Sequence, residues 1–92
     1  MQARFAVDQV HTDGRYSEYV RTSDEGEERV VFCICPECGA TVFYKPLSAP
    51  ELVAVPVGAF ADPTFPTPTW SVWESWQHSW VRLPEAIEYH WE

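Results

Sequence analysis

The sequence predicts an all-β protein: one small antiparallel β domain over residues 1–92. Eight prolines in 92 residues argue against long helices, because a proline inside a helix costs about 3 kcal/mol. Short runs of β-branched and aromatic residues alternate with turn residues, which is typical of strands joined by turns. At this length a hydrophobic core is only marginally stabilising, so a bound metal or a partner chain would help.

The first third of the chain predicts three strands. Residues 4–10 and 15–21 are β-compatible, and the Asp13-Gly14 pair between them predicts a hairpin turn. A charged turn over 23–28 follows, which is most simply a solvated loop tip. The apolar strand 29–32 then leads into a cluster that holds all three cysteines, Cys33-Ile34-Cys35-Pro36-Glu37-Cys38-Gly39.

Strands continue after the cysteine cluster. Residues 41–44 are strand-like and end at Lys45-Pro46, and 52–60 predicts a further strand in which Pro56 indicates an edge position or a bulge. The proline-rich segment 62–69 predicts an ordered surface loop.

Four tryptophans follow this loop at the spacing of one helical face: Trp70, Trp73, Trp76 and Trp80. They begin directly after three prolines, so we instead expect a strand over about 70–74 and then a loop or a single helical turn through Trp80. We expect these rings mainly to fill the core of a small domain. The alternative is a surface that binds a ligand or a partner.

Charge and composition exclude several function classes. The formal net charge of −8 disfavours nucleic acid and anionic membranes as partners, since both would repel the chain. The first residues lack the apolar run of a signal peptide, and no stretch has the length of a membrane span. We therefore expect a cytoplasmic protein, in which clustered thiols indicate metal or redox chemistry rather than disulfides.

Cys35 and Cys38 form a Cys-Pro-x-Cys-Gly unit typical of a zinc knuckle, a tight turn that presents two thiolates to one metal. Pro36 stiffens such a turn, and Gly39 supplies the positive φ that commonly follows the second cysteine. A redox Cys-x-x-Cys pair would normally open a helix, whereas a strand-like run follows here. The pattern therefore favours zinc as the cofactor.

The sequence does not decide which residues would be the remaining zinc ligands. Cys33 could be a third zinc ligand, because Cys-x-Cys-x-x-Cys can form a three-thiolate site with an open fourth position. Equally, it could point into the core as a small apolar side chain. His11, His78 and His90 could each complete a tetrahedron, but none has a ligand spacing to another. No catalytic residue can be assigned, since no Ser/His/Asp grouping or phosphate loop is present.

Residues 32–44 resemble the segment F-C-P-x-C-G-[ST]-x-[LV]-[FW] of the glutathione-dependent formaldehyde-activating enzyme (GFA) and centromere protein V family. The similarity extends to the strand and turn over 15–26, to Val55–Pro63, which resembles the family's V-x-x-G-[TA]-[LF]-x-[DN]-P strand, and to 72–75 with Trp80-Val81. Membership implies an all-β fold and a structural zinc whose second ligand pair matches Cys35 and Cys38. It also implies a second, catalytic zinc on a Cys-x-Cys-x-x-Cys motif further upstream, associated with carbon–sulfur lyase activity.

Residues 1–32 contain no cysteine, so both upstream motifs of the family are missing. The chain resembles a shortened member that covers the C-terminal two-thirds of the family pattern. The leading hypothesis is a structural zinc on Cys35 and Cys38, with Cys33 as a candidate third ligand, no lyase activity, and a homodimer as a candidate source of missing ligands. The alternatives are a carbon–sulfur lyase that acts on a glutathione–formaldehyde adduct through Cys33, Cys35 and Cys38, or a metal-free interaction module.

Overall fold

The computed structural model describes residues 1–91 and is all-β, as the sequence predicts. Every helical segment in this range is a 3-10 turn of three or four residues, and none is long and apolar enough to cross a membrane. The chain divides into two compact units, Met1–Ala61 and the part that begins at Asp62. We describe each unit by itself, and the expectation of one domain over 1–92 stays a prediction.

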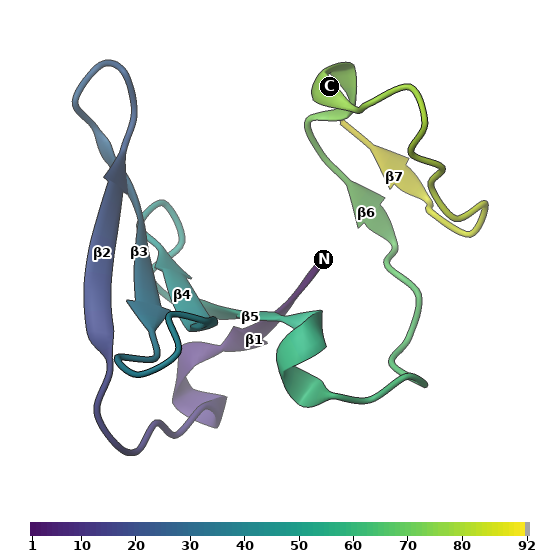
Figure 1. The fold of residues 1–92 in the computed structure, drawn as a ribbon. Coiled ribbons are helices and arrows are strands. Elements are labelled where there is room, and N and C mark those ends of the chain that lie inside the picture. Colours follow the sequence, from purple (N-terminus) through teal and green to yellow (C-terminus); the bar gives the residue numbers. More distant parts are fainter. Residues whose placement is uncertain (92) are drawn as a thin grey trace. The chain divides into compact units, whose positions relative to one another are not determined.

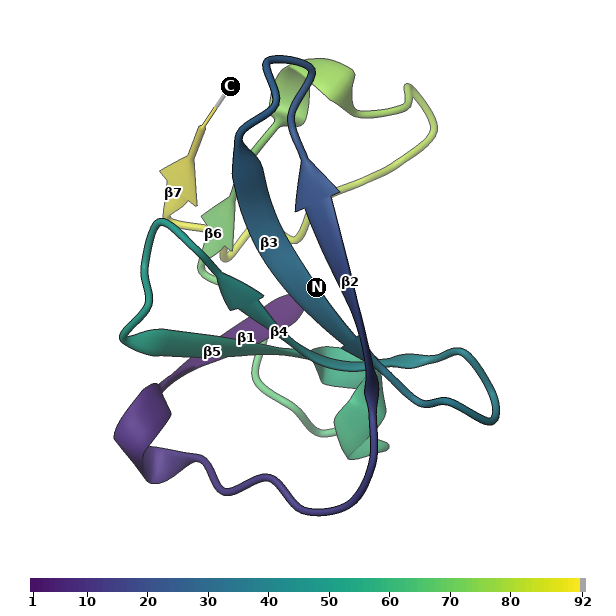
Figure 2. The same ribbon diagram turned by 90° about the vertical axis from the view of Figure 1, so that its left-hand side faces the viewer.

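The first unit contains a five-stranded antiparallel sheet in the order β1-β5-β4-β3-β2 (Figures 1 and 2). Its strands are β1 (Gln2–Ala6), β2 (Ser17–Thr22), β3 (Glu28–Ile34), β4 (Thr41–Pro46) and β5 (Leu52–Pro56). Short 3-10 turns follow β1 over Val7–Gln9 and β5 over Val57–Phe60. The charged turn expected after β2 is present and joins β2 to β3.

The predicted hairpin between the first two strands is wrong. The β1 strand pairs with β5 instead, so that Phe5 lies opposite Val53. The Asp13-Gly14 pair does form a local turn, in which the Gly14 N–H donates to the Asp13 carboxylate at 2.9 Å and Gly14 has a φ of +91°. Turn residues set the local backbone but not the partner strand, and here burial of apolar side chains between β1 and β5 sets that choice.

The core of this unit is small and lies on one face of the sheet. It consists of Cys33, Phe43 and Val53, with Val10, Val31 and Val55 packed around them. Cys33 on β3 lies directly opposite Phe43 on β4, and a bulge follows between Cys33 and Ile34. Successive residues of a strand face opposite sides, so this register commits Cys33 to the core.

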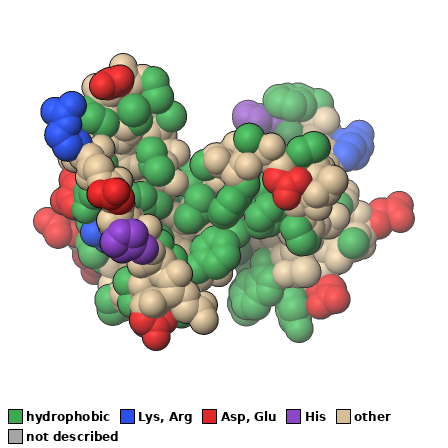
Figure 3. Space-filling model, turned by 90° about the horizontal axis from the view of Figure 1, so that it is seen from below, with side chains coloured by type: hydrophobic (Ala, Val, Ile, Leu, Met, Phe, Trp, Pro, Cys, Tyr) green, Lys and Arg blue, Asp and Glu red, His purple; other side chains and the backbone are tan. Residues whose placement is uncertain are grey.

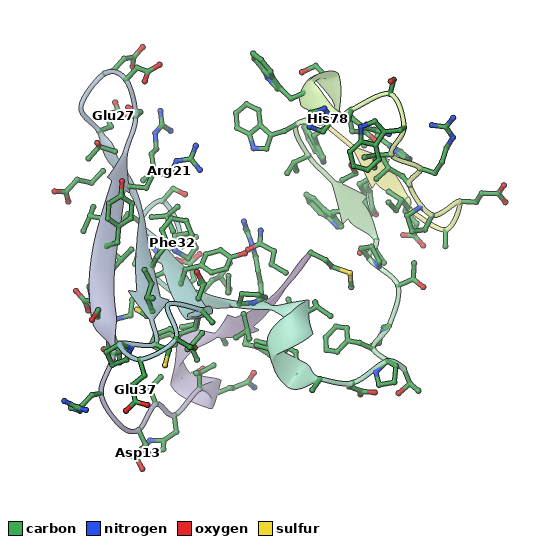
Figure 4. The ribbon with its side chains drawn as sticks, viewed as in Figure 1. Asp13, Arg21, Glu27, Phe32, Glu37 and His78 are labelled. Atoms are coloured by element: carbon green, nitrogen blue, oxygen red, sulfur yellow. The ribbon has the colours of Figure 1, made fainter. Side chains whose placement is uncertain are left out.

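The opposite face of the sheet carries a row of three aromatic rings. Tyr19, Phe32 and Tyr44 occupy paired positions on β2, β3 and β4, with ring centroids 6.4 Å and 5.5 Å apart. The Tyr44 hydroxyl donates to Gln2 Oε1 on β1. The row therefore connects four strands across this face, where Phe32 is labelled in Figure 4.

The second unit is held by a two-stranded parallel pair, β6 (Trp70–Ser71) and β7 (Tyr89–His90). A 3-10 turn over Glu74–Trp76 follows β6, so the expected order of a strand and then a single turn is confirmed, although the strand has only two residues. In the loop before β6, the Thr64 N–H and hydroxyl both donate to the Asp62 carboxylate, at 2.9 Å and 2.7 Å.

The expectation that the tryptophans fill the core is wrong. All five are exposed, with exposed fractions from 55% to 79%: Trp70, Trp73, Trp76, Trp80 and Trp91. Ile87 is the one buried hydrophobic residue that the described part of this unit contains, because so short a segment cannot enclose five indole rings. Hydrophobic side chains accordingly reach the surface (Figure 3).

Replacing Phe43 by Ala tests the core. Phe43 is only 7% exposed, so its truncation should lower the free energy of unfolding by about 3 kcal/mol, measured by urea denaturation with circular dichroism. Val42 on the same strand faces the other side and is 45% exposed. Val42→Ala, the matched control, should change the free energy of unfolding by less than about 0.5 kcal/mol. Equal losses for both variants would contradict the core described here.

The second unit should lose stability as pH rises. The Glu74 carboxylate lies 2.7 Å from His90 Nδ1 and raises the pKa of this imidazole above 6.5. A raised folded-state pKa contributes stability that is complete below the unfolded value and is lost as pH rises through the folded value. All five tryptophans lie in this unit, so thermal melts followed by their fluorescence measure it selectively.

In the wild type we expect the midpoint temperature of thermal unfolding to decrease as the pH is raised from about 6 to about 9. In His90→Gln this temperature should change much less. His78→Gln is the matched control, because His78 stacks on Trp80 rather than pairing with Glu74. A pH dependence that His78→Gln abolishes and His90→Gln keeps would contradict the assignment.

Candidate metal centre

Cys35 and Cys38 lie in the turn between β3 and β4, and we call residues Cys35–Gly39 the knuckle. The Cys35 N–H donates to the Ala40 carbonyl at 2.8 Å, and the Gly39 N–H donates to the Cys35 carbonyl at 2.9 Å. Gly39 has a φ of +78°, the positive value expected from the sequence and one that side chains disfavour. These two bonds close the turn and fix its backbone.

The knuckle favours the thiolate form of Cys35. The backbone N–H groups of Cys38, Glu37 and Gly39 and the Cys38 thiol donate hydrogen bonds toward Cys35 Sγ, with the Cys38 N–H contributing most, and lower the pKa of Cys35 below 9.0. Donors aimed at a sulfur stabilise its anionic form. The same donors remain available to a metal-bound thiolate, which is the form that zinc requires.

The knuckle is accessible from solvent. Cys35 is half-buried, and Glu37, Cys38 and Gly39 are exposed; Figure 4 shows Glu37 at the turn, at the opposite end of β3 from Glu27. The residues after Gly39 form strand β4 rather than a helix. The helix N-terminus that would activate a redox Cys-x-x-Cys pair is therefore replaced by a β-turn, which favours metal binding.

Cys33 lies in a different environment. It is fully buried beside Phe43 and Val53, and this burial raises the pKa of its thiol, with Lys45 acting in the lowering direction and Glu18 in the raising direction. The sequence left open whether Cys33 is a zinc ligand or a core side chain, and its position is that of a core side chain. Among residues 1–91 no group of three or more His, Cys, Asp or Glu side chains is arranged to hold a metal, so the three thiols are not brought together.

The histidines are placed elsewhere. His11 is exposed in the loop after the first 3-10 turn, His78 stacks on Trp80 with ring centroids 5.6 Å apart, and His90 is bonded to Glu74. The donor set thus fits one half of a tetrahedral zinc site: two thiols of the right chemistry, with backbone donors around one of them.

Sequence reasoning missed the His90–Glu74 pair, since the two residues are sixteen positions apart. It also missed the position of Lys45, whose Nζ lies 5.9 Å from the Phe43 ring centroid and 6.0 Å from that of Tyr16. Alternation along β4 could have placed Lys45 on the face of Phe43, but not above its ring.

Comparison with known proteins gives one family. The model of the glutathione-dependent formaldehyde-activating enzyme family matches residues 1–76, a range that contains the five-stranded sheet and the knuckle. No curated protein and no solved structure matches the chain.

The three thiols should differ in reactivity in metal-free protein. We expect iodoacetamide to label Cys35 and Cys38 first, and Cys33 only when the protein is unfolded, because alkylation requires an accessible thiolate. The labelling rate of Cys35 should reach half its maximum below pH 9.0, since its pKa is lowered from that value. Peptide mass spectrometry measures each site, and labelling in denaturant is the control. Native-state labelling of Cys33 as fast as that of Cys38 would contradict its burial.

Proposed function

The chain belongs to the glutathione-dependent formaldehyde-activating enzyme family, and from this premise we propose that it is a small zinc-binding member in which the metal is structural. In this proposal Cys35 and Cys38 are the zinc ligands, the protein is cytoplasmic, and it is not a carbon–sulfur lyase. The fold and the family place it among GFA-type β domains.

The observation that supports this proposal most is the set of hydrogen bonds in the knuckle. Two backbone bonds, from the Cys35 N–H to Ala40 and from the Gly39 N–H to Cys35, hold the turn closed, and the N–H groups of the turn, that of Cys38 most, lower the pKa of the Cys35 thiol. An unliganded pair of neighbouring thiolates would repel, and Zn²⁺ relieves that repulsion when it binds both. The turn thus holds the two sulfurs close together, with Cys35 favoured as a thiolate, as a shared cation would require.

The position of Cys33 argues against the enzymatic alternative. A catalytic zinc needs three protein ligands and one open position for the substrate. Here the third sulfur is packed against Phe43 and Val53, and using it as a ligand would require its removal from the core. A site that processes a glutathione–formaldehyde adduct on Cys33, Cys35 and Cys38 is therefore the less favoured function.

Metal analysis of purified protein tests the proposal. We expect bound zinc in the wild type, loss of at least nine-tenths of it in Cys35→Ser and Cys38→Ser, and full retention in Cys33→Ala, the matched control. Circular dichroism confirms that each variant is folded. Zinc absent from the wild type, with three freely titratable thiols, would overturn the proposal and favour a metal-free interaction module.

The lyase alternative makes the opposite prediction on two readouts. It requires Cys33→Ala to lose zinc, and it requires glutathione to perturb the visible spectrum of the cobalt-substituted protein, because an open position admits a thiol. We expect an unchanged cobalt spectrum on adding glutathione and no turnover of its formaldehyde adduct.

A further inference from the structure

Structural zinc is four-coordinate, and the described residues of one chain offer only two suitable donors in one place. No third His, Cys, Asp or Glu joins Cys35 and Cys38 within residues 1–91. Cys33 is buried behind the sheet surface, and His78 and His90 have other partners. If zinc binds as proposed above, half of its coordination sphere must come from elsewhere.

We propose that a second copy of this chain supplies that half: the knuckles of two protomers meet on a two-fold axis and hold one Zn²⁺ through Cys35 and Cys38 of each. This inference rests on the proposed zinc-binding function. It names the partner as the same chain and the shared site as four thiolates.

The geometry of the knuckle suits this arrangement. A tetrahedron has two-fold axes that exchange its vertices in pairs, so two identical Cys-x-x-Cys turns can fill it without distortion, and a two-fold contact uses the same surface on both partners. The knuckle lies at the tip of the β3–β4 hairpin, and its residues after Cys35 are exposed. A second hairpin tip can therefore approach the two sulfurs directly.

Charge makes the contact depend on the metal. Each chain carries a formal charge of −8, so two copies repel, and each knuckle adds the exposed carboxylate of Glu37 between its two thiols. Zn²⁺ at the axis compensates part of this repulsion. Without the metal, the two Glu37 carboxylates and the negative charge of both chains repel each other, and the pair of chains should separate.

Zinc titration with sedimentation analysis tests the inference on metal-free protein of the full chain. We expect binding to saturate at one zinc for every two chains, conversion of monomer to dimer at the same point, and return to monomer on adding a chelator. Cys33→Ala should behave as the wild type, whereas Cys35→Ser and Cys38→Ser should stay monomeric. A cobalt titration should reach its plateau at the same ratio.

The outcomes distinguish failure of the shared site from failure of the proposed zinc-binding function. Saturation at one zinc per chain with no change in mass would overturn the shared site but leave the zinc-binding function standing. A dimer that persists in chelator and in Cys35→Ser would also overturn it. No zinc binding at all would overturn both.

Glu37 provides a charge test with a matched control. Glu37→Gln removes one carboxylate from each side of the proposed axis and should lower the zinc-dependent dimer dissociation constant by about two- to five-fold at low salt, an effect that added salt should erase. Glu25→Gln makes the same change in net charge in the turn at the other end of β3, and it should have a smaller effect. Equal effects of the two variants would place the contact away from the knuckle and overturn the inference.

Discussion

The pairing of β3 with β4 is the interaction on which the rest of the structure depends. It sets Cys33 opposite Phe43, and these two side chains with Val53 are the core of the first unit. It also brings the end of β3 close enough to the start of β4 for a short turn to join them, and the knuckle is that turn. Core and candidate metal centre are thus two consequences of one strand register.

The same register divides three neighbouring cysteines into two kinds. Within β3, alternation sends Cys33 inward, and the bulge after it marks where regular pairing ends. Two residues later the chain has left the strand, so the side chain of Cys35 is directed by the turn and its N–H donors rather than by the sheet. Burial raises the pKa of the Cys33 thiol, whereas the turn lowers the pKa of the Cys35 thiol. Spacing along the sequence therefore does not translate into a three-sulfur site.

Much of this could be predicted from sequence, because its signals are local. The Cys-Pro-x-Cys-Gly unit and the positive φ of Gly39 depend on a few adjacent residues, as do the strands on either side of them. The partner of β1 could not be predicted, since Asp13-Gly14 fixes a turn but the choice of β5 depends on apolar contacts between distant residues. The prediction that the tryptophans are buried was wrong for a related reason. A large ring is buried only where enough chain surrounds it, and the unit around Ile87 is too short.

Loop-closure entropy decides what a metal at the knuckle can stabilise. Cys35 and Cys38 are three residues apart in a turn that two backbone hydrogen bonds already close, so a zinc that joined only these two would restrict the unfolded chain very little. A structural zinc stabilises most when it joins segments that are otherwise far apart. In this chain Cys33 is committed to the core, and the second copy proposed above would supply such a distant segment. A structural role for zinc and a site shared between two chains are therefore linked by the same physical argument.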